Sequence, residues 1–231
     1  MSSKLPGWVG AGAFLLSLAA GCVNAFTLMS IVATPVSHYT GTASAFAIAL
    51  TSGDAERASY LAFLTLAFVA GAAASGLIIR DYHLRLGRRY GVALMAESAL
   101  VLLAFIAYAD DPEVTHFLLA FACGLQNAMA TTYSGAVVRT THVTGILTDL
   151  GIQLSKALTG QKVDRGRVSL FLLIVTGFAS GGVLAGILYP LIGQSILLVV
   201  VFLTGSVGAS YYAYRAYCLA RAKVSEEATD E

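Results

Sequence analysis

The sequence predicts an all-α fold: a polytopic membrane helix bundle of six transmembrane helices, built as two inverted three-helix repeats, each with an extra short re-entrant or interfacial helix. Three observations predict this class. Of the 231 residues, 57% are hydrophobic and only 12% are charged, whereas a soluble domain is about a quarter charged. Several apolar runs reach about 20 residues, the length that crosses a hydrocarbon core as a helix. The two halves of the chain also resemble each other, which indicates a duplicated fold.

Six apolar segments are long enough to span a bilayer, and they are too long to be strands of a barrel. They are residues 12–33, 60–79, 90–108, 116–138, 168–191 and 195–217. Two shorter segments, residues 40–52 and 144–158, have a helical pattern but do not span comfortably, so re-entrant and interfacial placements both stay open. We therefore expect a single transmembrane domain over residues 1–231, with repeat 1 at 12–108, repeat 2 at 116–217 and a disordered cytoplasmic tail at 224–231.

Lysine and arginine in the short loops predict the orientation, because these residues are enriched on the cytoplasmic side of membrane proteins. The loop after the second span, the stretch after the fourth span and the C-terminal end are basic, whereas the opposite side carries mainly acidic residues. Both termini are therefore predicted to be cytoplasmic. The net charge is only +1, so nucleic acid is not an expected partner.

An internal repeat is visible at three places. Residues 14–25 (FLLSLAAGCVNA) match residues 117–128 (FLLAFACGLQNA), residues 38–41 (HYTG) match 142–145 (HVTG), and residues 68–71 with Gly76 match 178–181 with Gly186. Each unit crosses the membrane an odd number of times, so the second unit must be inverted relative to the first. Inverted repeats with paired short helices are the recurring plan of secondary transporters, an analogy that some channels share.

The two His-x-Thr-Gly segments are the sharpest candidates for a binding site. Threonine is a good N-cap, and a short helix that begins inside the membrane presents free N–H groups and the positive end of its dipole to an anion. The predicted substrate-binding residues of these segments are His38, Thr40, Gly41, His142, Thr144 and Gly145. Ordinary capping of two interfacial helices is the alternative interpretation.

Nearby polar residues complete the predicted site. Arg139 precedes the second segment, and Asp149 belongs to a polar stripe on the following helix, which equally fits the wet face of an amphipathic helix. Ala45 stands where Asp149 would align in the first copy, so we expect an asymmetric site. Asn24 and Asn127 lie at matching depths in the first and fourth spans, where they either bind substrate or hydrogen-bond to neighbouring helices.

Glu97 lies inside the third span, where an ionisable group is costly unless it is paired, protonated or facing water. We predict that it couples transport to protons; a neutral glutamate bonded to a neighbouring helix is the alternative.

No zinc motif, phosphate-binding loop or nucleophile elbow occurs, so no catalytic residue, metal or cofactor is predicted, and the chain is not expected to be an enzyme. Small-x-x-x-small patterns at 71–76 and 177–186 predict close helix packing and leave a homodimer open.

Residues 123–128 (CGLQNA) and 133–151 (YSGAVVRTTHVTGILTDLG) resemble the YoaK-type family of small bacterial transmembrane proteins, a family of unknown function. The resemblance covers nearly the whole chain, although Asn24 and Thr42 depart from the family's pattern of Asp and Asn. It implies a bacterial inner membrane and transport of a small molecule. The expected partners are the lipid bilayer and a small, anionic or zwitterionic metabolite; the alternative is a channel or a non-transporting module such as an assembly partner or lipid binder.

Overall fold

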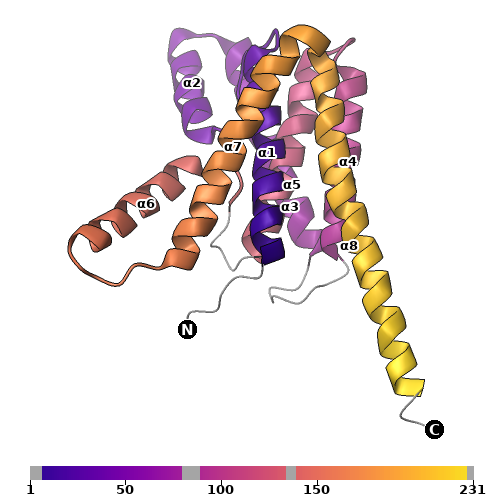
Figure 1. Cartoon of the computed structure of the whole chain (residues 1–231). Helices are drawn as coiled ribbons and strands as arrows, with labels where there is room; N and C mark the ends of the chain where they lie inside the picture. The colour runs from indigo at the N-terminus through magenta and orange to yellow at the C-terminus, as the bar shows by residue number, and fades with distance from the viewer. Residues whose placement is uncertain (1–6, 80–88, 134–138, 228–231) are drawn as a thin grey trace.

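The structure is a computed structural model that describes residues 7–79, 89–133 and 139–227, which are helical and contain no strand. Six long helices form a bundle: α1 (Gly7–Met29), α3 (Ala55–Ile78), α4 (Arg89–Ala107), α5 (Pro112–Tyr133), α7 (Arg165–Ile192) and α8 (Ile196–Glu227). Two short helices, α2 (Tyr39–Ser52) and α6 (Val143–Leu158), project from one flank of this bundle (Figure 1). The predicted helical bundle is therefore confirmed, and all eight predicted helices occur.

Among the residues that the structure describes, four segments are long and apolar enough to cross a membrane, namely Val9–Met29, Ala55–Ile78, Tyr90–Ala107 and Arg165–Tyr214. The last of these is 50 residues long. It contains α7 and much of α8, which run in opposite directions because the chain reverses at the 3-10 turn Gly193–Ser195 (Figure 1). The chain is thus a helical membrane protein, as its composition predicted.

The distribution of side chains agrees with a lipid environment. Large apolar side chains point outwards: Val69, Val183 and Phe202 are 57%, 62% and 74% exposed. Polar side chains such as Glu97 and Gln126 are buried in the bundle instead. Water would favour the reverse arrangement, whereas lipid tails solvate the apolar outer face and polar groups find partners inside.

Glycines allow the closest contacts between helices. Five of the described glycines lie against the backbone of another helix: Gly21 against Phe178, Gly181 against Leu18, Gly177 against Phe14, Gly71 against Phe121 and Gly124 against Phe68. A Cβ atom at any of these positions would overlap a carbonyl group, so only glycine fits. Close packing is therefore confirmed at Gly71, Gly177 and Gly181, whereas Gly76, Gly182 and Gly186 have open space around them.

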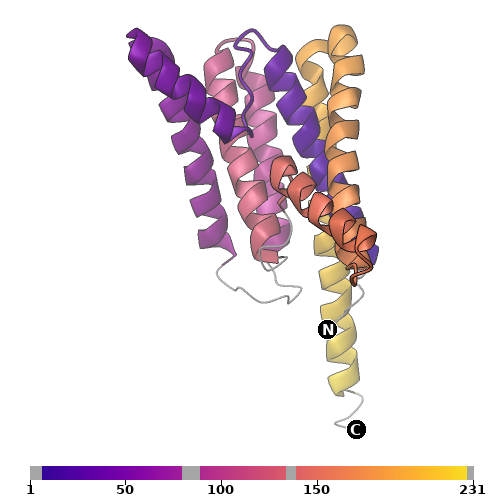
Figure 2. The same cartoon turned by 90° about the vertical axis from the view of Figure 1, so that its left-hand side faces the viewer.

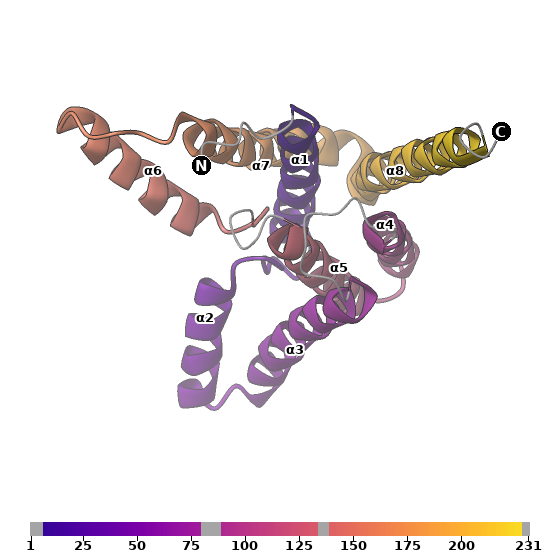
Figure 3. The same cartoon turned by 90° about the horizontal axis from the view of Figure 1, so that it is seen from below.

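Each short helix begins near the middle of the bundle. After α1, a connector of residues 30–38 turns back inwards, and α2 then runs outwards to the start of α3 (Figures 1 and 2). After α5, a second connector ends at residues 139–142, and α6 runs from mid-bundle to the start of α7 at the opposite end. The N-terminal ends of α2 and α6 lie close together in all three views (Figure 3).

The first and last described residues, Gly7 and Glu227, lie towards the same end of the bundle (Figure 1). Helix α8 continues to Glu227, which lies within the expected tail 224–231. Residues 228–231 lie outside the described residues, as do residues 134–138 of the fourth expected span and the basic loop 80–88.

Candidate functional site

Two buried asparagines hold the connectors in place. The Asn24 side-chain oxygen accepts a hydrogen bond of 2.8 Å from the Ser37 hydroxyl. The Asn127 amide donates to the Thr141 hydroxyl at 2.8 Å, and its oxygen accepts from the Thr141 backbone N–H at 3.3 Å. These bonds tie Ser37 to α1 and Thr141 to α5, and each of these two residues comes just before a His-x-Thr-Gly segment. Equivalent positions in the sequence repeat therefore make equivalent contacts.

The His-x-Thr-Gly histidines, not the threonines, are the N-cap residues. The carbonyl oxygens of His38 and His142 accept the first helical hydrogen bonds, and neither imidazole caps its helix. The predicted Thr N-caps are therefore wrong, because each helix begins earlier and places Thr40 and Thr144 inside its first turn, exposed. Those threonine hydroxyls remain available to a ligand.

The first N–H groups of both short helices are unsatisfied. Within the described residues, the backbone N–H groups of residues 39–41 and 143–145 have no hydrogen-bond partner. Four such donors are left at every helix start and need a side chain, water or a ligand. Here the two helix starts face a shared region near mid-bundle (Figure 2), and convergent N–H donors of this kind suit an anionic group.

The two copies differ in how their histidines lie. The His142 ring folds over the first turn of α6, where a Cβ at Gly145 would come within 2.6 Å of its Nδ1 atom. A side chain at position 145 would therefore displace that ring. In the first copy Gly41 has open space around it, and His38 instead packs edge-on against Phe178 of α7, with ring centroids 6.2 Å apart.

Glu97 of α4 is linked to the second connector by side chains. One carboxylate oxygen of Glu97, which is 4% exposed, accepts from the Gln126 amide at 2.8 Å. The Gln126 oxygen accepts in turn from the Thr140 hydroxyl, also at 2.8 Å. The second carboxylate oxygen of Glu97 is buried without a partner among the described residues. A change in the charge or position of the Glu97 side chain would therefore affect the second connector through the hydrogen bonds of Gln126.

Two predicted charged residues lie apart from this polar group. The Asp149 carboxylate lies 3.4 Å from the Arg167 guanidinium, and both side chains are more than 40% exposed, at 42% and 44%. The Gln153 side chain on the same stripe accepts from the Asp164 backbone N–H of the loop before α7. The stripe thus attaches α6 to α7. The Arg139 side chain is exposed and has no hydrogen bond or ion pair with a described residue, while the Arg139 carbonyl accepts from the His142 backbone N–H.

The sequence analysis missed a buried histidine near the other end of the bundle. His116 is fully buried in α5, with Nε2 2.8 Å from the Ser30 hydroxyl and Nδ1 2.8 Å from the Tyr60 hydroxyl. Because Ser30 donates its proton to the Thr27 carbonyl, it accepts from Nε2–H, and Tyr60 donates to Nδ1. This network ties the first connector to α3 and α5. A histidine inside an apolar span was the signal for it.

Comparison with known families gives one match. Residues 12–210 match the family described as "Protein of unknown function (DUF1275)". The match includes both His-x-Thr-Gly segments and confirms the resemblance drawn from residues 123–128 and 133–151. Comparison with curated proteins and with solved structures gives no match.

Proposed function

The chain belongs to the DUF1275 family of proteins of unknown function, and from that premise we propose that it is a transporter of a small, anionic or zwitterionic metabolite in the bacterial inner membrane. One observation carries the proposal: α2 and α6 begin near mid-bundle, with their N-terminal ends close together and unsatisfied (Figure 2). The substrate binds between these two helix starts. His38, Thr40 and Gly41 on one side, with His142, Thr144 and Gly145 on the other, surround it.

Six membrane crossings fit the lengths of the helices. At about 1.5 Å per residue, long helices of 19 to 32 residues extend over about 28–48 Å, whereas α2 and α6, with 14 and 16 residues, reach only about 21–24 Å. A hydrocarbon core of about 30 Å suits the first group alone. In this arrangement α2 and α6 are re-entrant, and both termini are cytoplasmic.

The glycine contacts support an inverted repeat. Gly21 corresponds to Gly124, and Gly181 to Gly71, in the alignment of the two halves. The backbone segments that they touch correspond in the same way, so α1 packs against α7 as α5 packs against α3. A pseudo-twofold axis in the membrane plane would produce this relation, and transporters built so rock one repeat against the other around a fixed site.

The chemistry of the site favours an anionic group. Each helix start carries roughly half a positive charge from the aligned peptide dipoles, and the N–H groups of residues 39–41 and 143–145 supply donors. Glu97 is the candidate for proton coupling, because its carboxylate is buried and Gln126 joins it to the Thr140 hydroxyl of the second connector. Gain or loss of a proton there would alter the hydrogen bonds beside the helix start.

Thermal unfolding of the detergent-purified protein tests the proposal. The ligands are small carboxylates, phosphates and amino acids, each at pH 5.5 and 7.5. A ligand that binds only the folded state stabilises it by about 2.7 kcal/mol at 100 times its Kd. We expect ligands of one chemical class to raise the unfolding midpoint of the wild type, and we expect this shift to be lost in Thr144→Val. Thr148→Val is the control and should keep the shift, because the exposed Thr148 hydroxyl donates to the Thr144 carbonyl within α6.

The other outcomes separate the alternatives. A shift that survives in both Thr40→Val and Thr144→Val would remove the helix starts as the binding site. Flux into proteoliposomes that saturates with the identified ligand supports a transporter, whereas weakly saturable current supports a channel. No shift with any compound would favour a non-transporting module.

A further inference from the structure

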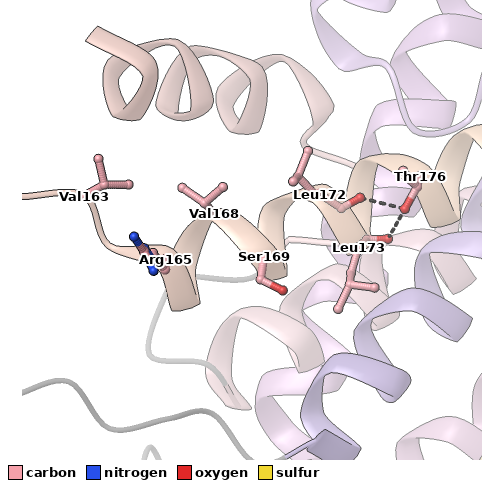
Figure 4. Close-up of a pocket in the computed structure, with 7 residues that line it drawn as sticks. All are labelled: Val163, Arg165, Val168, Ser169, Leu172, Leu173 and Thr176. Atoms are coloured by element: carbon pink, nitrogen blue, oxygen red, sulfur yellow. Dashed lines mark hydrogen bonds between the residues drawn. The ribbon is translucent and has the colours of Figure 1, made fainter. Parts of the chain in front are cut away.

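A cavity of about 330 Å³ lies along the first turns of α7, away from the starts of the short helices. Its lining residues are Val163, Arg165, Val168, Ser169, Leu172, Leu173 and Thr176 (Figure 4). Helices α6 and α7 diverge towards this end, which is the end of the bundle where Gly7 and Glu227 lie (Figure 1). The cavity is therefore an open groove beside a membrane-crossing segment.

One cation, Arg165, lines the groove, and the segment 149–167 that leads into it is basic. That segment carries four cations and two carboxylates: Lys156, Lys162, Arg165, Arg167, Asp149 and Asp164. Arg167 is paired with Asp149, and Asp164 caps α7 by accepting from the Arg167 backbone N–H. The Arg165 guanidinium has no hydrogen bond or ion pair with any described residue. The groove thus presents an unpaired guanidinium at its edge.

The walls of the groove are mainly apolar, and the neighbouring helix α6 also carries exposed apolar side chains. Val168 and Leu172 lie on the same side of α7 in Figure 4, and Leu172 is 49% exposed. On α6, Leu154 and Leu158 are 61% and 80% exposed. A free inorganic anion would use only the cation, whereas a molecule with a charged head and a hydrocarbon chain would use both the cation and the walls.

We propose that this groove is a binding site for an anionic phospholipid, with its phosphate on Arg165 and one acyl chain along Val168 and Leu172. Arg165 stands where the polar loop 159–164 meets the apolar part of α7, the depth at which a headgroup lies. Basic pockets between membrane helices bind anionic headgroups in this way. The lipid lies along the first turns of α7, next to the end of the loop that joins α6 to α7.

Titration of the detergent-purified protein with dioleoylphosphatidylglycerol, followed by thermal unfolding, tests the site. Dioleoylphosphatidylcholine, with identical chains, is the reference lipid. We expect phosphatidylglycerol to raise the unfolding midpoint at concentrations where phosphatidylcholine does not. Arg165→Gln should raise the half-saturating concentration of phosphatidylglycerol about fivefold, the contribution of one cation near a headgroup. Ser169→Phe should fill the groove and abolish the response.

Two matched variants control for charge and bulk. Arg221→Gln removes one positive charge from the last part of α8, and Val183→Phe adds an aromatic ring at an exposed position of α7 outside the groove; both should keep the wild-type response. Equal midpoint shifts with the two lipids, or an Arg165→Gln response equal to wild type, would overturn the proposal. Native mass spectrometry of the wild type adds a test without variants: bound phosphatidylglycerol in no excess over phosphatidylcholine would also overturn it.

Discussion

Two adjacent glycines of α7 have opposite surroundings, and this difference makes a prediction about stability. A Cβ at Gly181 would overlap the backbone of Leu18, whereas Gly182 has nothing within 4 Å. Gly181→Ala should therefore destabilise the protein by about 1–3 kcal/mol, the usual cost of overpacking. Gly182→Ala should be neutral or stabilise by up to about 1 kcal/mol, because alanine favours helix. Thermal unfolding of both variants in one detergent measures the pair, and equal losses would contradict the close α1–α7 contact.

The internal repeat predicted which residues correspond, because matching positions in two copies of a fold meet matching neighbours. Gly21 with Gly124 and Asn24 with Asn127 follow that rule. The partner of Asp149 could not be predicted in this way. Helical periodicity placed it on a polar face, but only the packing of α6 shows that this face meets Arg167 of α7 and not the helix starts.

At the scale of elements, the bounds of the short helices were predicted closely. The expected helices 40–52 and 144–158 begin one residue later than Tyr39–Ser52 and Val143–Leu158 and end at the same residues. Their depth could not be predicted, because length and hydropathy do not reveal that a connector turns back into the bundle. Tertiary hydrogen bonds hold the connectors there, and such bonds join residues that are 13 and 14 positions apart.

The second connector provides a prediction about one of these bonds. Asn127→Leu removes the partner of both the Thr141 hydroxyl and the Thr141 N–H. Buried groups left unsatisfied cost about 1–3 kcal/mol each, so we expect lower stability and faster hydrogen exchange of the first hydrogen-bonded amides of α6, which begin at Ile146. Asn24→Leu is the matched variant in the other copy, where only the Ser37 bond is lost, and its effect on stability should be smaller.

Hydrogen-exchange mass spectrometry with thermal unfolding measures both effects. Faster exchange confined to α6 in Asn127→Leu, and to α2 in Asn24→Leu, is the expected pattern. Exchange that is unchanged at both helix starts would mean that the asparagines do not hold the connectors.

At the scale of the whole molecule, polar side chains are turned inwards, and this explains why fewer apolar segments than long helices are recognised. Helix α5 buries Gln126, Asn127 and His116, so it is not among the four segments apolar enough to be recognised as spans. Helices α7 and α8 are counted as one segment because only a short turn separates them. The presence of six long helices therefore does not conflict with the recognition of only four apolar segments among the described residues.

Cysteine labelling in intact cells distinguishes six crossings from four. In a background without Cys218, single cysteines at Ser52, Asp110 and Gln194 should react with a membrane-impermeant maleimide from outside, and Lys162→Cys should react only after permeabilisation. Labelling at position 194 shows whether the segment Arg165–Tyr214 crosses the membrane twice or once. If the segment crossed only once, position 194 would lie inside the membrane and would not be labelled. Labelling of positions 110 and 162 from the same side would mean that α5 does not cross the membrane. The proposed inverted repeat would then be wrong as well.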